Sequence, residues 1–132
     1  MGRFSGLMSV LLALSSGASA TELPLMRGFY VDTSTTCSNA SNATLFLLQR
    51  DQLVAGGREI CTFAQIVPKD SRHFVVNEVC ETVREMVVEW TIEGEGRFSR
   101  TYANGESHSA QFCPQSSLPE PWRNNDISDR IR

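Results

Sequence analysis

The segment that decides the fold of this chain reads MVVEWTIE, from Met86 to Glu93. Its apolar side chains recur at every second position, whereas the opposite face carries Glu89, Thr91 and Glu93 and only one apolar residue, Val87. A period of two residues is that of a β-strand with one buried face. The glutamates therefore indicate a solvated sheet face rather than the paired carboxylates of a glycoside hydrolase. The side chains expected to be buried are Met86, Val88, Trp90 and Ile92.

Residues 77–90 also fit a helix, because several apolar residues fall on one helical face with glutamates opposite. The strand interpretation is favoured for two reasons. The apolar run 74–76 leads directly into this stretch, and the period of two continues through Ile92. We therefore expect two strands joined by a loop.

The C-terminal side of this segment predicts a hairpin. Phe98, Arg100 and Tyr102 share one face of the first strand, and residues 108, 110 and 112 share one face of the next. In an antiparallel pair, the residue numbers of two facing positions always have the same sum. The two apolar faces lie on the same side of the sheet only if that sum is even. A three-residue loop, 103–105, satisfies this condition and places Phe98 opposite Ala110, with Gly105 in the left-handed position.

Further strand and turn signals precede this region. Strands are expected at 28–31, 44–49, 53–54, 59–67 and 73–80, separated by turns rich in glycine, proline and aspartate. The pattern predicts a mainly β fold: a small antiparallel β-barrel or sandwich with meander topology, braced by two disulfides.

The N-terminal residues 1–20 have the pattern of a signal peptide. Arg3 precedes an apolar run at 7–14, and a small-x-small cleavage site ends at Ala20. The run is shorter than the roughly 20 residues that span a bilayer, and no second segment of that length follows. We expect a single β domain at 21–113, a flexible C-terminal tail at 114–132, and a periplasmic or secreted location.

The chain has four cysteines, all after the predicted signal peptide. An even number of cysteines in an exported protein indicates disulfides. If 59–67 and 73–80 form a hairpin, Cys61 and Cys80 lie near its open end. This geometry favours Cys61–Cys80 together with Cys37–Cys113, and the sequential pairing is the close alternative. No Cys-x-x-Cys occurs, so neither a thioredoxin-type centre nor a zinc ribbon is indicated.

The remaining polar residues do not form a recognisable catalytic or metal-binding pattern. The two histidines, His73 and His108, share no ligand spacing with another imidazole or acid. Motifs of serine hydrolases, zinc proteases and phosphate-binding loops are absent from the sequence. The net charge of −3 argues against nucleic acid as a partner. We expect no enzyme activity and no cofactor.

Four segments in order resemble a known pattern: RGFY at 27–30, EIC at 59–61, HFVVNEVC at 73–80 and QFC at 111–113. In this order they resemble small uncharacterised exported proteins of alphaproteobacteria that carry four spaced cysteines. The resemblance implies a periplasmic address and a compact, mostly antiparallel β fold, and it transfers no catalytic residue. The residues after Cys113 depart from that pattern.

These observations favour a binding module for a small ligand or a periplasmic or extracellular protein. The alternative is an inhibitor of a secreted hydrolase such as lysozyme. Asn39 and Asn42 stand in N-glycosylation acceptor patterns, which in a eukaryotic secretory protein would mark a surface loop. The expected binding rim consists of Thr35, Asn39, His108 and Trp122.

Overall fold

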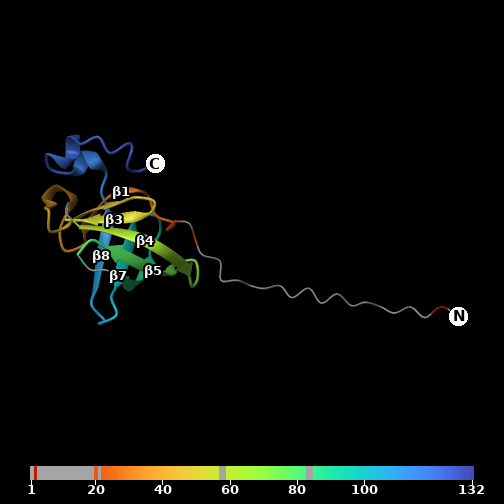
Figure 1. The fold of residues 1–132 in the computed structure, drawn as a ribbon. Helices are drawn as coiled ribbons and strands as arrows, with labels where there is room; N and C mark the ends of the chain where they lie inside the picture. Colours follow the sequence, from red (N-terminus) through yellow and green to blue (C-terminus); the bar gives the residue numbers. More distant parts are fainter. Residues whose placement is uncertain (1, 3–19, 21, 57–58, 83–84) are drawn as a thin grey trace.

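The computed structural model describes Gly2, Ala20 and residues 22–56, 59–82 and 85–132. These residues form eight strands in a closed antiparallel barrel in which each strand pairs with its neighbours in the sequence (Figure 1). β1 also pairs with β8, and this closes the sheet. The fold is therefore a meander barrel rather than a sandwich. The strands are β1 (Gly28–Asp32), β2 (Leu45–Leu48), β3 (Gln52–Ala55), β4 (Glu59–Pro68), β5 (His73–Cys80), β6 (Met86–Ile92), β7 (Arg97–Thr101) and β8 (Ser107–Phe112).

The alternation of β6 is confirmed. Val88, Trp90 and Ile92 are buried inside the barrel, Met86 at the start of the strand is only half-buried, and Glu89 is exposed. The two-strand interpretation of this region is also confirmed, because β5 ends at Cys80 and β6 begins at Met86.

The predicted hairpin register is confirmed as well. Phe98 pairs with Ala110, and the amide of Tyr102 donates to the carbonyl of Glu106 across 2.8 Å. The loop is therefore 103–105, and Gly105 has a φ of +88°, which favours glycine.

Both favoured disulfides are present. Cys61 and Cys80 lie directly opposite each other in the β4–β5 ladder, with their Cα atoms 4.0 Å apart. Cys37 joins Cys113 and ties the β1–β2 loop to the residue after β8. On the chain-entropy account Cys61–Cys80 contributes about 3 kcal/mol and Cys37–Cys113, which closes the longer loop, about 4.5 kcal/mol.

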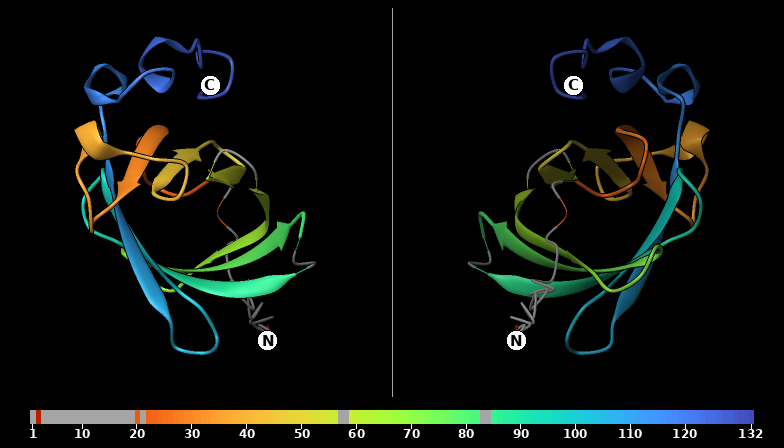
Figure 2. Two further views of the ribbon diagram at one scale, coloured as in Figure 1. Left: turned by 90° about the vertical axis from the view of Figure 1, so that its left-hand side faces the viewer. Right: turned by 90° about the vertical axis from the view of Figure 1, so that its right-hand side faces the viewer.

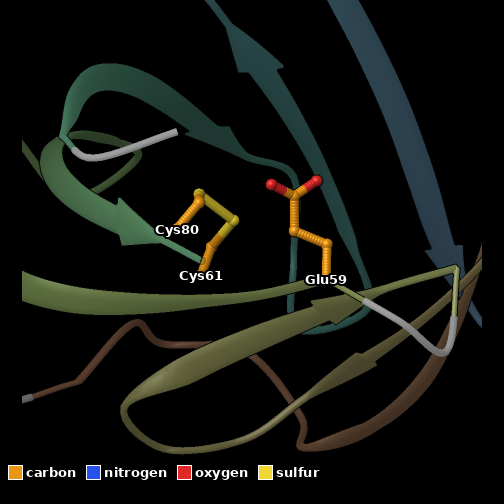
Figure 3. Close-up of side chains that lie close together, drawn as sticks. All are labelled: Glu59, Cys61 and Cys80. Atoms are coloured by element: carbon orange, nitrogen blue, oxygen red, sulfur yellow. A yellow bond between two sulfur atoms is a disulfide. The ribbon is translucent and has the colours of Figure 1, made fainter. Parts of the chain in front are cut away.

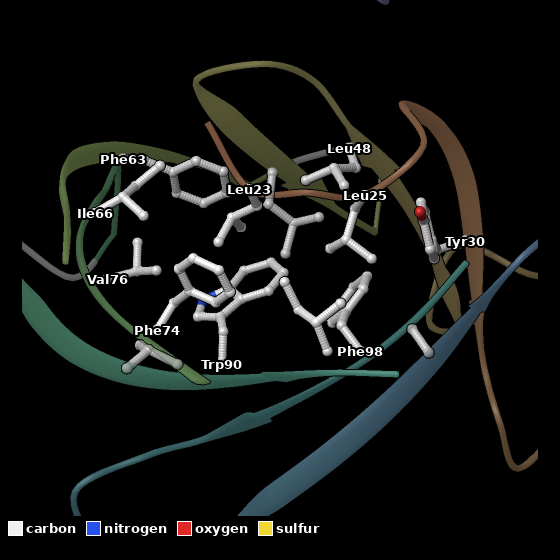
Figure 4. Packing of buried hydrophobic residues seen from close by; sticks show 14 residues of the cluster. Leu23, Leu25, Tyr30, Leu48, Phe63, Ile66, Phe74, Val76, Trp90 and Phe98 are labelled. Atoms are coloured by element: carbon white, nitrogen blue, oxygen red, sulfur yellow. The ribbon is translucent and has the colours of Figure 1, made fainter. Parts of the chain in front are cut away.

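The N-terminal residues of the described chain close one end of the barrel. Leu23 and Leu25 are buried within the main core cluster, where Leu23 lies on the side of Phe63 and Leu25 on the side of Leu48 (Figure 4). The amide of Met26 donates to the carbonyl of Glu95 across 2.8 Å and holds this segment across the barrel end. The predicted signal peptide, residues 1–20, lies outside the described residues apart from Gly2 and Ala20.

Residues 114–132, predicted as a flexible tail, lie against the barrel in the structure. Two 3₁₀ helices shape the segment, η2 (Gln115–Ser117) and η3 (Trp122–Asn124). Leu118 and Ile127 are buried, and Figure 2 shows the segment, in dark blue, outside the wall formed by β1 to β3. None of the helices in the described ranges is long and apolar enough to cross a membrane.

Candidate ligand-binding groove

The outer wall of the barrel is apolar at β1 and β2, which is unusual for a single-walled antiparallel barrel. β1 begins GFYV and β2 reads LFLL, so neither strand alternates with polar residues. Tyr30 and Leu48 face the barrel core, and their neighbours form a second buried cluster on the outside. A strand that is apolar on both faces requires cover on both. The members of the outer cluster are Phe29, Val31, Ala40, Leu45, Leu47, Cys113, Leu118 and Ile127.

The C-terminal segment, residues 114–132, provides this cover. The Cys37–Cys113 disulfide anchors its start, and Leu118 packs into the outer cluster. The side-chain amide of Gln115 donates to the backbone carbonyl of Trp122 across 2.8 Å and to that of Asn125, which folds the segment on itself. The segment therefore returns over the wall instead of leaving it.

A groove remains between this segment and the wall. Its volume is about 360 Å³, and we call it the C-terminal groove. The apolar part of its lining consists of Phe29, Leu45, Phe46, Leu47, Val54, Trp122 and Ile127. The polar part consists of Asn42, Asn125, Asp126 and Arg130.

A second cavity of about 500 Å³ adjoins the C-terminal groove, since Val54 and Arg130 line both. We call it the charged annex. Its lining is mostly polar and comes from the β2–β3 turn, from β3, from the start of β4 and from the end of the C-terminal segment. The charged members are Arg50, Asp51, Asp129, Arg130 and Arg132.

The residues expected to form a binding rim lie in different places. Trp122 is half-buried and lines the C-terminal groove. Thr35 and Asn39 belong to the β1–β2 loop, where Thr35 is half-buried and Asn39 exposed. His108 lies inside the barrel, where its ring stacks on that of Phe46 at 5.7 Å between centroids. Phe46 thus contacts His108 and also lines the groove.

The interior holds a buried ion pair beneath His108. Glu78 is 0% exposed and Arg100 is 3% exposed. The guanidinium of Arg100 donates to both carboxylate oxygens of Glu78, and the indole of Trp90 donates to Oε2 across 2.8 Å. The carboxylate therefore has three donors, as a buried charge requires.

Arg100 extends this network to His108. Its Nη1 donates to the hydroxyl oxygen of Tyr102 across 2.9 Å, and that hydroxyl lies 2.9 Å from Nε2 of His108. Burial and the positive charge of Arg100 lower the pKa of His108, against an opposing contribution from Asp32. Neutral His108 accepts at Nε2 and carries its proton on Nδ1, which is buried without a partner in the described part of the chain.

Two other groups of chemically active side chains lie outside the groove. Glu59 lies close to Cys61 and Cys80 (Figure 3), but the two sulfurs are bonded to each other and are not thiolates. His73 Nδ1 lies 2.8 Å from an oxygen of Asp70, whose pKa is lowered by the backbone N–H of Arg72 and by His73. Among the described residues, no hydroxyl or thiol is hydrogen-bonded to this histidine.

Sequence reasoning missed most of the groove residues because it treated 114–132 as a tail. The available signal was the composition of β1 and β2. Segments that are apolar at four consecutive positions predict cover on both faces, and the apolar residues after Cys113 can provide it.

Comparison with known proteins finds no matching protein family, no matching curated protein and no matching solved structure. The resemblance to exported four-cysteine proteins therefore stays a prediction.

Proposed function

We propose that this protein is a non-enzymatic binding domain that holds a small, largely apolar ligand in the C-terminal groove. The lining of the groove supports the proposal: apolar side chains from the wall and from the C-terminal segment meet around about 360 Å³. Protein ligand pockets typically measure about 300–1,000 Å³ and combine an apolar lining with a few polar groups. Asn42, Asn125 and Arg130 are such polar groups here.

The barrel interior supports the choice of the groove over the lumen. The interior of an eight-stranded barrel either is filled by side chains or holds one small ligand, and in this barrel side chains fill it. Trp90, Phe98 and Leu53 are fully buried there, and Leu23 and Leu25 pack on them from one end. A ligand in the lumen would have to displace these side chains, whereas the groove is already hollow.

The proposed location of the protein is the periplasm or the extracellular medium. Two disulfides brace the domain, and such bonds persist in oxidising compartments. Residues 1–20 also have the pattern of an export signal. The natural ligand is therefore to be sought among compounds of the periplasm or the medium.

The first test uses phenylnaphthylamine, an uncharged aromatic dye, with the ¹⁵N-labelled mature protein. The chain has two tryptophans, so its spectrum contains two indole N–H signals. Trp122 lines the groove, and Trp90 is buried in the barrel. We expect the dye to shift the Trp122 signal and leave that of Trp90 unchanged. A dye that binds and shifts only Trp90 would place the site in the lumen and refute the proposal.

The second test is Trp122→Ala, measured by dye fluorescence. Full burial of a large apolar side chain against a ligand is worth about 1.5–3 kcal/mol, so Trp122, which is half-buried, should contribute about tenfold in affinity. Val87→Ala is the matched control, because Val87 is an exposed apolar residue of β6 outside the groove lining. Equal affinity of the two variants would show that the dye binds elsewhere.

A further inference from the structure

The charged annex beside the C-terminal groove contains more arginine than acid. Arg50, Arg130 and Arg132 line it together with Asp51 and Asp129. Arg50 comes from the β2–β3 turn, and the other two arginines come from the end of the C-terminal segment. Two parts of the chain far apart in sequence thus bring positive charge to one end of the groove.

The ion pairs in this region leave two of the arginines available. Arg132 Nη2 lies 3.0 Å from Oδ1 of Asp129, so these two charges neutralise each other. Arg50 and Arg130 form no ion pair and no side-chain hydrogen bond with the part of the chain that the structure describes. Asp51, the remaining acid of the annex, opposes one of these two charges.

Asp126, the acid in the lining of the C-terminal groove, is hydrogen-bonded within its own turn. Oδ1 of Asp126 accepts from the amide of Ser128 at 3.0 Å and from its hydroxyl at 2.7 Å, and these bonds lower the pKa of Asp126. The carboxylate therefore stays ionised, with Oδ1 turned toward the Ser128 donors of its own turn, and its charge opposes part of the positive charge at this end of the groove. Arg130, by contrast, lines both cavities and stands where the apolar groove meets the annex.

We propose that the ligand is an amphipathic anion. Its apolar body lies against Trp122 and Ile127, and its carboxylate, sulfonate or phosphate group is bound by Arg130 with Arg50. A guanidinium presents paired N–H donors that match the geometry of such oxyanions. This inference rests on the proposed binding function and adds the charge of the ligand to it.

The test compares two dyes that share an aromatic body. Anilinonaphthalene sulfonate carries a negative charge, and phenylnaphthylamine does not. We expect the sulfonate to bind the wild-type protein more tightly. We also expect its affinity alone to fall as salt is added, because ionic strength screens exposed charges. Binding in the groove is verified by the shift of the Trp122 indole signal.

Arg130→Gln and Arg50→Gln should each weaken sulfonate binding by up to about fivefold, the upper end of the range of an exposed charge pair. Neither change should alter the binding of phenylnaphthylamine. Arg97→Gln is the control, since it removes the same charge from an exposed residue of β7 outside both cavities.

The outcomes separate this inference from the function on which it rests. Equal affinity for both dyes, with a Trp122 shift from each, would retain the binding function and refute the anionic ligand. The same loss of sulfonate binding in Arg97→Gln as in Arg130→Gln would also refute it, because the effect would then be one of net charge. If neither dye shifts Trp122, both proposals fail.

Discussion

The buried Glu78–Arg100 pair offers the most direct test of how this barrel is stabilised. Replacement of Arg100 by leucine leaves a carboxylate that is 0% exposed with one remaining side-chain donor, the indole of Trp90. Loss of one partner from a buried ion pair typically costs about 3–5 kcal/mol. Small domains have a total free energy of unfolding of about 5–15 kcal/mol. The Arg100→Leu variant should therefore be folded but marginal.

The reverse change, Glu78→Leu, removes the acceptor of both Arg100 and Trp90. The cost of the unpaired Arg100 is again about 3–5 kcal/mol, and the buried indole N–H adds about 1–3 kcal/mol. The double variant carries no unpaired charge, so the costs that persist are those of the unpaired Trp90 N–H and of the hydrogen bond from Arg100 to Tyr102. We therefore expect the double variant to be more stable than Glu78→Leu alone.

The assay is urea unfolding of the four proteins of this double-mutant cycle with both disulfides oxidised. The midpoint and the slope are measured for each, because a changed slope would indicate a changed unfolded or native ensemble. The reasoning would be refuted if the loss of stability in the double variant equalled the sum of the losses in the two single variants. It would also be refuted if Arg100→Leu lowered the free energy of unfolding by less than about 1 kcal/mol. Such a result would mean that water reaches the pair.

Two further predictions concern single positions. Because the pKa of His108 is lowered from 6.5 in the folded protein, the unfolded chain binds its proton first as the pH falls. Above about pH 6.5 His108 is neutral in both states, so its contribution to the free energy of unfolding is fully present. That contribution is lost as the pH falls through the pKa that His108 has in the folded protein. His108→Gln should remove that dependence in urea titrations over this range, and the exposed control His73→Gln should not. The other prediction concerns Gly56 and Gly94, which both have a positive φ, +60° and +65°. A Cβ atom added at Gly56 would lie 2.7 Å from the carbonyl oxygen of Asn42, whereas a Cβ atom added at Gly94 would meet nothing within 4 Å. Gly94→Ala should therefore cost about 1–2 kcal/mol, the penalty of the left-handed conformation, and Gly56→Ala more. Equal urea midpoints for the two variants would contradict the clash.

Local pattern was sufficient for the hairpin and for β6. In β6 the period of two assigns Val88 and Trp90 to the buried face without knowledge of any partner strand. In the β7–β8 hairpin, the two apolar faces lie on the same side only if the numbers of paired residues have an even sum. This condition predicted the three-residue loop and the Phe98–Ala110 pair. The Cys61–Cys80 disulfide followed from a hairpin of the same kind, although sequence left the alternative pairing open.

The Glu78–Arg100 pair could not be predicted in the same way. Its members are 22 positions apart, on β5 and β7, and β6 lies between them. The inward position of Arg100 between Phe98 and Tyr102 implies that a counter-charge is required. Several glutamates of the chain could have supplied it, and only the curvature of the sheet brings Glu78 within reach.

By itself, the sequence determined the strands, the buried faces of β6 and of the β7–β8 hairpin, and the register of that hairpin, because side-chain alternation and turn chemistry act between residues that are close along the chain. Only the tertiary structure decided that the sheet closes and that residues 114–132 return over the apolar outer wall. Closure and cover depend on burial of surfaces distant in sequence, and the hydrophobic effect that drives such burial is non-directional. Composition therefore indicates that the outer faces of β1 and β2 need a cover, but not which segment provides it.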